Sequence, residues 1–164
     1  MEFSEKRKIL KGINLEIAKG KCIVLMGENG IGKTTSIRII CGLLSQNQGK
    51  ISSKGKISYL PEVSSIYPYL IARESIDLFS NFGNVMYDTD LLLDMLKLPK
   101  DSKTLSKDNS KRTKRKTSMG IVMSTGSDLF VMDGHTMNPY IISVTMLLHF
   151  SFLTMLIFQI IGPN

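Results

Sequence analysis

One stretch of nine residues, GENGIGKTT at positions 27–35, constrains this chain more than any other feature. It follows the apolar run CIVLM, which is typical of a central buried strand, and it leads into KTTSIRIICGLLS, whose apolar residues recur at helical spacing. Glycines let successive backbone N–H groups curl around an anion, and the start of a helix directs its positive dipole end at the same anion. The stretch therefore predicts a phosphate-binding loop between a strand and a helix.

The loop matches the pattern G-x-x-x-x-G-K-[ST], whose side chains suit a nucleoside triphosphate bound with Mg²⁺. We expect the Lys33 ammonium to reach the β- and γ-phosphates and the Thr34 hydroxyl to ligate Mg²⁺. A second, acidic metal ligand is expected where another buried strand ends, and DLFVMD places Asp133 there. Lys33 and Asp133 are therefore the predicted catalytic residues.

Strand and helix patterns alternate along the chain, which predicts an α/β fold of the phosphate-loop NTPase kind with a mostly parallel sheet. Strands are expected over 12–20, 22–26 and 127–133, and two short ones in GKISSKGKISYLP around Gly55. Helices are expected from Lys33 onward and over 70–82 and 89–98, and KTSMGIVMS at 116–124 also fits a helix. The Ser-rich stretch 100–118 is expected to be at least partly loop.

The net charge of +7 is concentrated in one segment. Eight basic and two acidic residues lie between positions 100 and 116, so this segment supplies +6 of the total. The rest of the chain is nearly neutral, which argues against a protein that is basic all over for nucleic acid. For the run SKRTKRK we favour a solvated face, because no aromatic residues interleave for base stacking. A nucleic-acid or nuclear-import patch and attraction to anionic lipid headgroups are the alternatives.

The tail IISVTMLLHFSFLTMLIFQII, at positions 141–161, has 21 residues and no formal charge. Its length suits a membrane span, but His149, Gln159 and the hydroxyl residues weaken that interpretation. The alternatives are a buried helix followed by a buried strand, FLTMLIFQII, and a disordered or truncated end. We therefore expect one domain over 1–140 and a separate apolar tail over 141–164.

The sequence resembles the ATP-binding subunit of an ATP-binding cassette (ABC) transporter of the drug- and peptide-export kind. The resemblance covers residues 3 to about 138 and is strongest from ILKGINLEIAKGKCIVLMGENGIGKTT through SSIYPYLIARESIDLF. It implies an N-terminal antiparallel β part, a small helical subdomain at about 66–120, a truncated C-terminal part, and ATP with Mg²⁺ as the bound cofactor. The implied nucleotide-binding residues are Phe3, which would stack on adenine, the loop residues Asn29, Gly30, Ile31, Gly32, Lys33, Thr34 and Thr35, and Ser110 toward a partner's γ-phosphate.

The resemblance also implies an assembly. Two such domains would sandwich two ATP molecules, and closure of the pair would drive separate membrane-spanning subunits docked near Tyr67–Ile71. The chain would then lie in the cytoplasm, peripheral to the inner face of the cell membrane, with no nucleic-acid partner.

Several positions depart from the family pattern. Glu62 stands where a metal- and water-coupled glutamine is usual, and we assign it to the metal site. The signature motif fits either LSKDN at 105–109 or NSKRT at 109–113; the second keeps family spacing, and both lack the second glycine. Gly134 replaces the glutamate that polarises the attacking water. His135 is one residue away and is more simply an exposed loop histidine, and His149 comes too early to be the switch histidine.

These departures leave two hypotheses open. The chain is expected to be the ATP-binding subunit that couples ATP binding and hydrolysis to export. The alternative is a degenerate ATP-binding module with little or no hydrolysis, because loss of a general base lowers rates by about 10²–10⁴-fold.

Overall fold

The structure is a computed structural model that describes residues 10, 12–28, 30–63, 66–83 and 87–133, together with the backbone of 154–159. Four strands form one sheet in the order β1-β4-β3-β2, and every pair in it is parallel. The strands are β1 (Cys22–Met26), β2 (Ile57–Leu60), β3 (Leu129–Met132) and β4 (Thr154–Gln159). The predicted α/β fold with a mostly parallel sheet is thereby confirmed.

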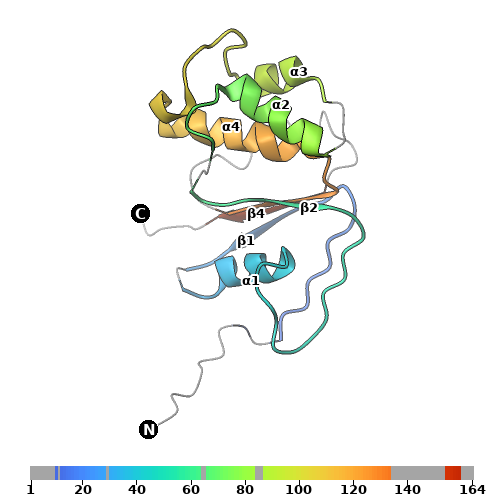
Figure 1. The fold of residues 1–164 in the computed structure, drawn as a ribbon. Helices are drawn as coiled ribbons and strands as arrows, with labels where there is room; N and C mark the ends of the chain where they lie inside the picture. Colours follow the sequence, from blue (N-terminus) through green and yellow to red (C-terminus); the bar gives the residue numbers. More distant parts are fainter. Residues whose placement is uncertain are drawn as a thin grey trace.

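Helices cover both faces of the sheet (Figure 1). Helix α1 (Lys33–Ile40) lies on one face, and α2 (Ala72–Gly83), α3 (Thr89–Met95) and α4 (Lys111–Ser124) lie on the other. A short 3₁₀ turn, η1 (Ser106–Asp108), precedes α4. Because side chains alternate along a strand, Leu129 and Val131 face α1, whereas Phe130 and Met132 face the three-helix layer.

Local sequence explains where the helices of this layer begin. The Glu74 carboxylate accepts a hydrogen bond from the Ile71 N–H at 3.0 Å, as in a capping box at the start of α2. Asp88 caps α3 by accepting from the Asp90 and Leu91 N–H groups at 2.9 and 3.2 Å. Ser110 caps α4 by accepting from the Thr113 N–H at 3.1 Å.

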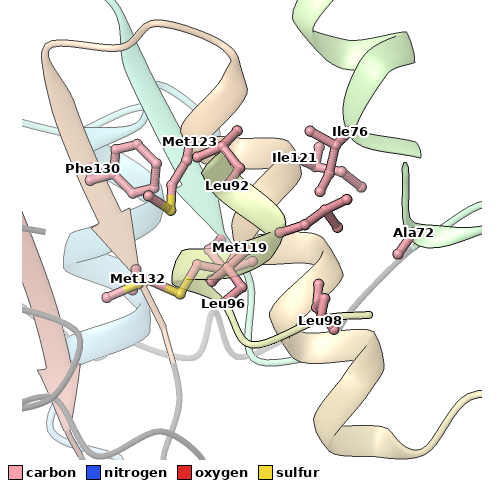
Figure 2. Packing of buried hydrophobic residues seen from close by; sticks show 12 residues of the cluster. Ala72, Ile76, Leu92, Leu96, Leu98, Met119, Ile121, Met123, Phe130 and Met132 are labelled. Atoms are coloured by element: carbon pink, nitrogen blue, oxygen red, sulfur yellow. The ribbon is translucent and has the colours of Figure 1, made fainter. Parts of the chain in front are cut away.

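The three helices meet in one large apolar core, seen at close range in Figure 2. Ile76, Leu92 and Leu93 are each at most 1% exposed there. Gly120 allows close packing of α4, because a Cβ at this position would lie 2.7 Å from Ile76 Cδ1 and 3.0 Å from Leu96 Cδ1. This core fixes α4 against the sheet.

Two predicted strands are absent from the described residues, and one predicted helix begins earlier than expected. Residues 12–18 form no strand, and the alternating residues Ile13 (59% exposed) and Leu15 (41%) are exposed. The described sheet contains no antiparallel pair, and residues 1–9, where the expected N-terminal antiparallel part would begin, lie outside the described residues. The first strand expected near Gly55 is also not formed; only β2 is. Helix α4 begins at Lys111, so much of the basic run is helical.

Part of the apolar tail belongs to the sheet. The backbone of Thr154–Gln159 forms β4 between β1 and β3, which is the strand that the helix–strand alternative expects. Residues 141–153, where that alternative expects a helix, lie outside the described residues. In the described part of the chain, no helix is both long and apolar enough to cross a bilayer.

Candidate functional site

The predicted site residues follow the carboxyl ends of parallel strands. The phosphate loop follows β1, Glu62 lies two residues after β2, and Asp133 comes directly after β3. Since the strands are parallel, these ends meet at the same edge of the sheet, which is where open α/β sheets bind their ligands. Asp133 and the end of β2 are joined directly, because the Asp133 N–H donates to the Leu60 carbonyl at 2.9 Å.

The backbone of the loop suits an anion. Gly30 and Gly32 have φ values of 83° and 98°, which favour glycine over any residue with a Cβ. A Cβ at Gly30 would meet no atom within 4 Å, so that side of the loop is open. Gly32 is also the N-cap of α1, and as a glycine it has no side chain with which to cap that helix. The N-cap residue therefore leaves the first N–H groups of α1 for a ligand.

The Lys33 ammonium is held against the loop. It donates to the carbonyl oxygens of Gly27 and Glu28, which are the first two residues of the motif. Thr34 and Thr35 follow in the first turn of α1, and both are half-buried. The predicted cation and the predicted metal-binding hydroxyl therefore stand together where the helix begins.

Asp133 faces the same side of the sheet as α1, since it continues the alternation of Leu129 and Val131. It is 6% exposed, and the Tyr59 hydroxyl donates to its Oδ2 at 3.2 Å. Burial raises the pKa of Tyr59, and the charge of Asp133 adds to this, whereas a hydrogen bond from Arg38 of α1 lowers it. Tyr59 thus orients the Asp133 carboxylate, a role that sequence reasoning missed.

Arg115 of α4 is a second residue that sequence reasoning missed. Its guanidinium donates through Nη1 to the carbonyls of Pro61 and Glu62, the latter at 3.3 Å, and through Nη2 to the carbonyl of Asp133 at 2.7 Å. The residue is only 7% exposed. Because Arg115 belongs to the basic run SKRTKRK, its sequence context predicts a solvated cation. Only the packing of α4 distinguishes this buried arginine from the less buried cations around it.

The structure separates the two placements of the signature motif. Ser106, in the first placement, is fully buried in η1. Ser110, in the second, is exposed and stands at the N-terminus of the 14-residue helix α4. Lys111 and Arg112 follow it, and no acidic residue lies in this first turn. Only the second placement therefore offers an exposed serine at a helix N-terminus.

The donors present fit a magnesium nucleotide. Among the described residues no group of three or more His, Cys, Asp and Glu side chains could hold a metal. Mg²⁺ in nucleotide sites needs no such cage, because it takes one or two protein ligands and the phosphate oxygens. Thr34 and Asp133 supply that kind of ligand. Phe3 and Asn29, which are also predicted to bind nucleotide, lie outside the described residues, as do Gly134, His135 and His149.

Comparison with known proteins agrees with this geometry. The chain is 30% identical over 141 residues to the lantibiotic transport ATP-binding protein SrtF of Streptococcus pyogenes. The aligned part covers 80% of this chain and 62% of SrtF. It is 28% identical over 148 residues to the linearmycin resistance ATP-binding protein LnrL of Bacillus subtilis, again over 80% of this chain but 48% of the relative. The chain thus spans about half to three fifths of the length of these relatives.

A solved ATP-binding subunit of an ABC transporter shares the fold, with a TM-score of 0.79 over 96% of this chain and 75% of that one, at 20% identity. The family model described as ABC transporter matches residues 10–137, which include the phosphate loop, Glu62, Ser110 and Asp133. The chain therefore belongs to the ABC transporter family, among its ATP-binding domains.

Proposed function

We propose that this chain binds ATP with Mg²⁺ at the carboxyl edge of its sheet and serves as the ATP-binding subunit of an ABC exporter. The observation that carries the proposal is the loop itself: glycines with positive φ, a helix start with glycine as its N-cap and the Lys33 ammonium all stand at one place. These groups would hold the phosphates through N–H groups and positive charge. Bound Mg²⁺ would neutralise the phosphate oxygens, with Thr34 and the Tyr59-oriented Asp133 as its protein ligands.

The N-terminus of α4 supports a role for a second copy of the chain. Lys111 and Arg112 stand in the first turn, where the helix dipole disfavours cations. An anion placed there would offset that repulsion, and a γ-phosphate held by the partner's loop has the required charge. Ser110, exposed at this end, would then donate to the partner's phosphate while its oxygen caps α4.

An exposed aromatic surface supports docking on membrane-spanning subunits. Three aromatic side chains are largely exposed, Tyr67 by 54%, Tyr69 by 72% and Phe82 by 76%. The Phe79 ring lies between Tyr67 and Phe82, with its centroid 6.2 Å from the centroid of each of these two rings. Such patches mark sites of protein association. Export as the direction of transport is supported by the functions for which the two relatives are named, lantibiotic transport and linearmycin resistance. We place the chain at the cytoplasmic face of the cell membrane accordingly.

Titration of the purified chain with labelled ATP, with and without Mg²⁺, tests nucleotide binding. Saturable, Mg²⁺-dependent binding is expected, and Lys33→Ala should weaken it by about 10- to 100-fold, the range for losing a charge-assisted contact. Lys54→Ala, which removes an exposed lysine outside the loop, should bind like the wild type. Absence of saturable binding by the folded wild type would overturn the proposal.

The second candidate function is a binding module that turns ATP over slowly or not at all, and Gly134 favours it because glycine offers no general base. Phosphate release distinguishes the two. A wild-type rate above that of Lys33→Ala supports the transport ATPase, whereas equal background rates support the module. Gly134→Glu should raise the rate by about 10²–10⁴-fold if only the base is missing. Gly134→Gln, with the same length and no carboxylate, should leave the rate unchanged.

A further inference from the structure

Arg115 is a buried cation whose partners come from two different loop ends. Its three recorded acceptors are the carbonyl oxygens of Pro61, Glu62 and Asp133. Pro61 and Glu62 follow β2, Asp133 follows β3, and Arg115 itself belongs to α4. One guanidinium therefore bridges the loop that carries Glu62, the predicted metal ligand Asp133 and the helix that starts at Ser110.

The recorded hydrogen bonds of this guanidinium all go to backbone carbonyls. Burial lowers the pKa of Arg115, while the charges of Asp133 and Glu62 act in the opposite direction. Nε is buried and has no hydrogen-bond partner among the residues that the structure describes. Burying a charge that is only partly satisfied costs free energy, so an apolar residue would serve packing at this position better. What a planar guanidinium adds is a fixed set of donors that holds several carbonyls in one geometry.

Helix α4 connects this bridge to its own N-terminus. Arg115 lies five residues after Ser110, which is about 7.5 Å along a helix axis. The core below α4 includes Met119, Ile121 and Met123, each at most 8% exposed, so the helix is fixed on the side away from solvent. A shift of the backbone at Glu62 or Asp133 therefore moves the Arg115 guanidinium that is hydrogen-bonded to it. Because α4 is rigid over the one and a half turns between Arg115 and Ser110, that movement also displaces Ser110.

We propose that Arg115 is a positioning residue that couples the metal side of the site, Asp133 and Glu62, to the Ser110 end of α4. Nucleotide bound in one copy would then set the placement of the N-terminus that this same copy presents to its partner. This inference rests on the proposed function, because it requires Mg²⁺ and nucleotide at Asp133. By reciprocity, α4 would also influence nucleotide binding at Asp133.

Amide hydrogen exchange on the full chain, with and without ATP and Mg²⁺, tests the coupling. In the wild type we expect the nucleotide to slow exchange in the loop and α1, over residues 30–36, and also in the first turns of α4, over 113–117. The slowing in α4 should be about fivefold or more, which is the low end for coupled sites. In Arg115→Met the loop should remain protected while the slowing in α4 is lost. Arg115→Lys, with one ammonium for three carbonyls, should retain only part of it.

Lys116→Met is the matched control, because Lys116 is the next cation on α4 and its one recorded acceptor among the described residues is the Lys97 carbonyl at 3.2 Å. It should respond to nucleotide like the wild type. A purely structural role would speed exchange in α4 of Arg115→Met equally with and without nucleotide, leaving the nucleotide-dependent ratio intact, and that result overturns the inference. If Arg115→Met does not fold, the same ratio measured in Arg115→Lys decides: a wild-type value overturns the inference and a reduced value supports it. An unprotected loop in the wild type overturns the proposed function and the inference together.

Discussion

On the face of the sheet covered by α2, α3 and α4, twelve described residues form one buried cluster. On the face covered by α1, the cluster of buried residues in the described part of the chain consists of Ile37 and Val131, with half-buried neighbours around them. The phosphate loop leads into α1, whereas Arg115 comes from α4 on the opposite face. The loop takes its shape from backbone geometry at a few glycines, whereas the contacts of Asp133 with Arg115 depend on a packed core that brings distant residues together.

The largest expected effect is on the free energy of unfolding when one of two isoleucines, both 0% exposed, is replaced by alanine. Ile76→Ala opens a cavity inside the large cluster and should lower the free energy of unfolding by about 3 to 4 kcal/mol. Ile37→Ala removes the same atoms on the α1 side, where half-buried neighbours can move inward, and should cost about 2 kcal/mol. Urea unfolding of both variants gives the comparison. Equal losses would show that the two faces are packed alike.

Cys41, which follows α1 directly, measures how far the α1 face of the sheet excludes water. Burial, with a smaller contribution from the charge of Asp133, raises the pKa of its thiol from 9.0 to about 11. At pH 8 the fraction of Cys41 present as thiolate is then about 100-fold lower in the folded chain than in the unfolded chain. Because the thiolate is the reactive form, alkylation by iodoacetamide should be slower by about the same factor. Mass spectrometry assigns the modified cysteine, and the chain in urea is the control. An equal rate in both states would show that the thiol is solvated.

The same shift predicts an alkaline loss of stability. Between pH 9 and about 11 the folded chain holds the Cys41 proton more tightly than the unfolded chain does. The free energy of unfolding should therefore fall as pH rises through that window, and it should be unaffected by this group below pH 9. Cys41→Ala should unfold with a shallower dependence on pH in this range.

Alanine substitutions at two glycines separate the stability cost of backbone conformation from the stability cost of side-chain packing. At Gly30 a Cβ meets no atom, but φ is 83°, so Gly30→Ala should cost about 1 to 2 kcal/mol from conformation alone. At Gly120 a Cβ crowds the ends of the Ile76 and Leu96 side chains, while alanine favours the helix by about 1 kcal/mol. Because those side-chain ends can shift, Gly120→Ala should be nearly neutral in unfolding experiments. The opposite order of the two losses would contradict this assignment of causes.

The smallest expected effect concerns the cationic first turn of α4. Arg112→Glu places a favourable charge near the helix N-terminus and should stabilise the chain without nucleotide by about 0.5 kcal/mol. The same change should weaken ATP-dependent association of two copies, because it repels the partner's phosphate. Thermal unfolding and light scattering with ATP and Mg²⁺ measure the two effects. Gains in both stability and association would argue against an anion at this turn.

The predictions from sequence were most accurate where the interacting residues are close together along the chain. The strand, loop and helix around Lys33 form as predicted, because glycine geometry and helical periodicity are local. Strand 12–20 failed for the opposite reason: alternation in Ile13 and Leu15 makes a strand only if another strand supplies hydrogen bonds and covers the apolar side chains. The roles predicted for Lys33, Thr34, Glu62, Ser110 and Asp133 stay predictions that nucleotide binding must test.

Sequence by itself determined the phosphate loop, the strand and the helix that flank it and the parallel α/β order, since each follows from contacts between near neighbours and from the period of the apolar residues. Only the tertiary structure decided that Arg115 is buried against Pro61, Glu62 and Asp133, that Tyr59 holds the Asp133 carboxylate, and that Ser110 rather than Ser106 is exposed. The physical reason is that these contacts join residues 18 to 74 positions apart, and packing of separate elements, not any local pattern, sets which side chain reaches which partner.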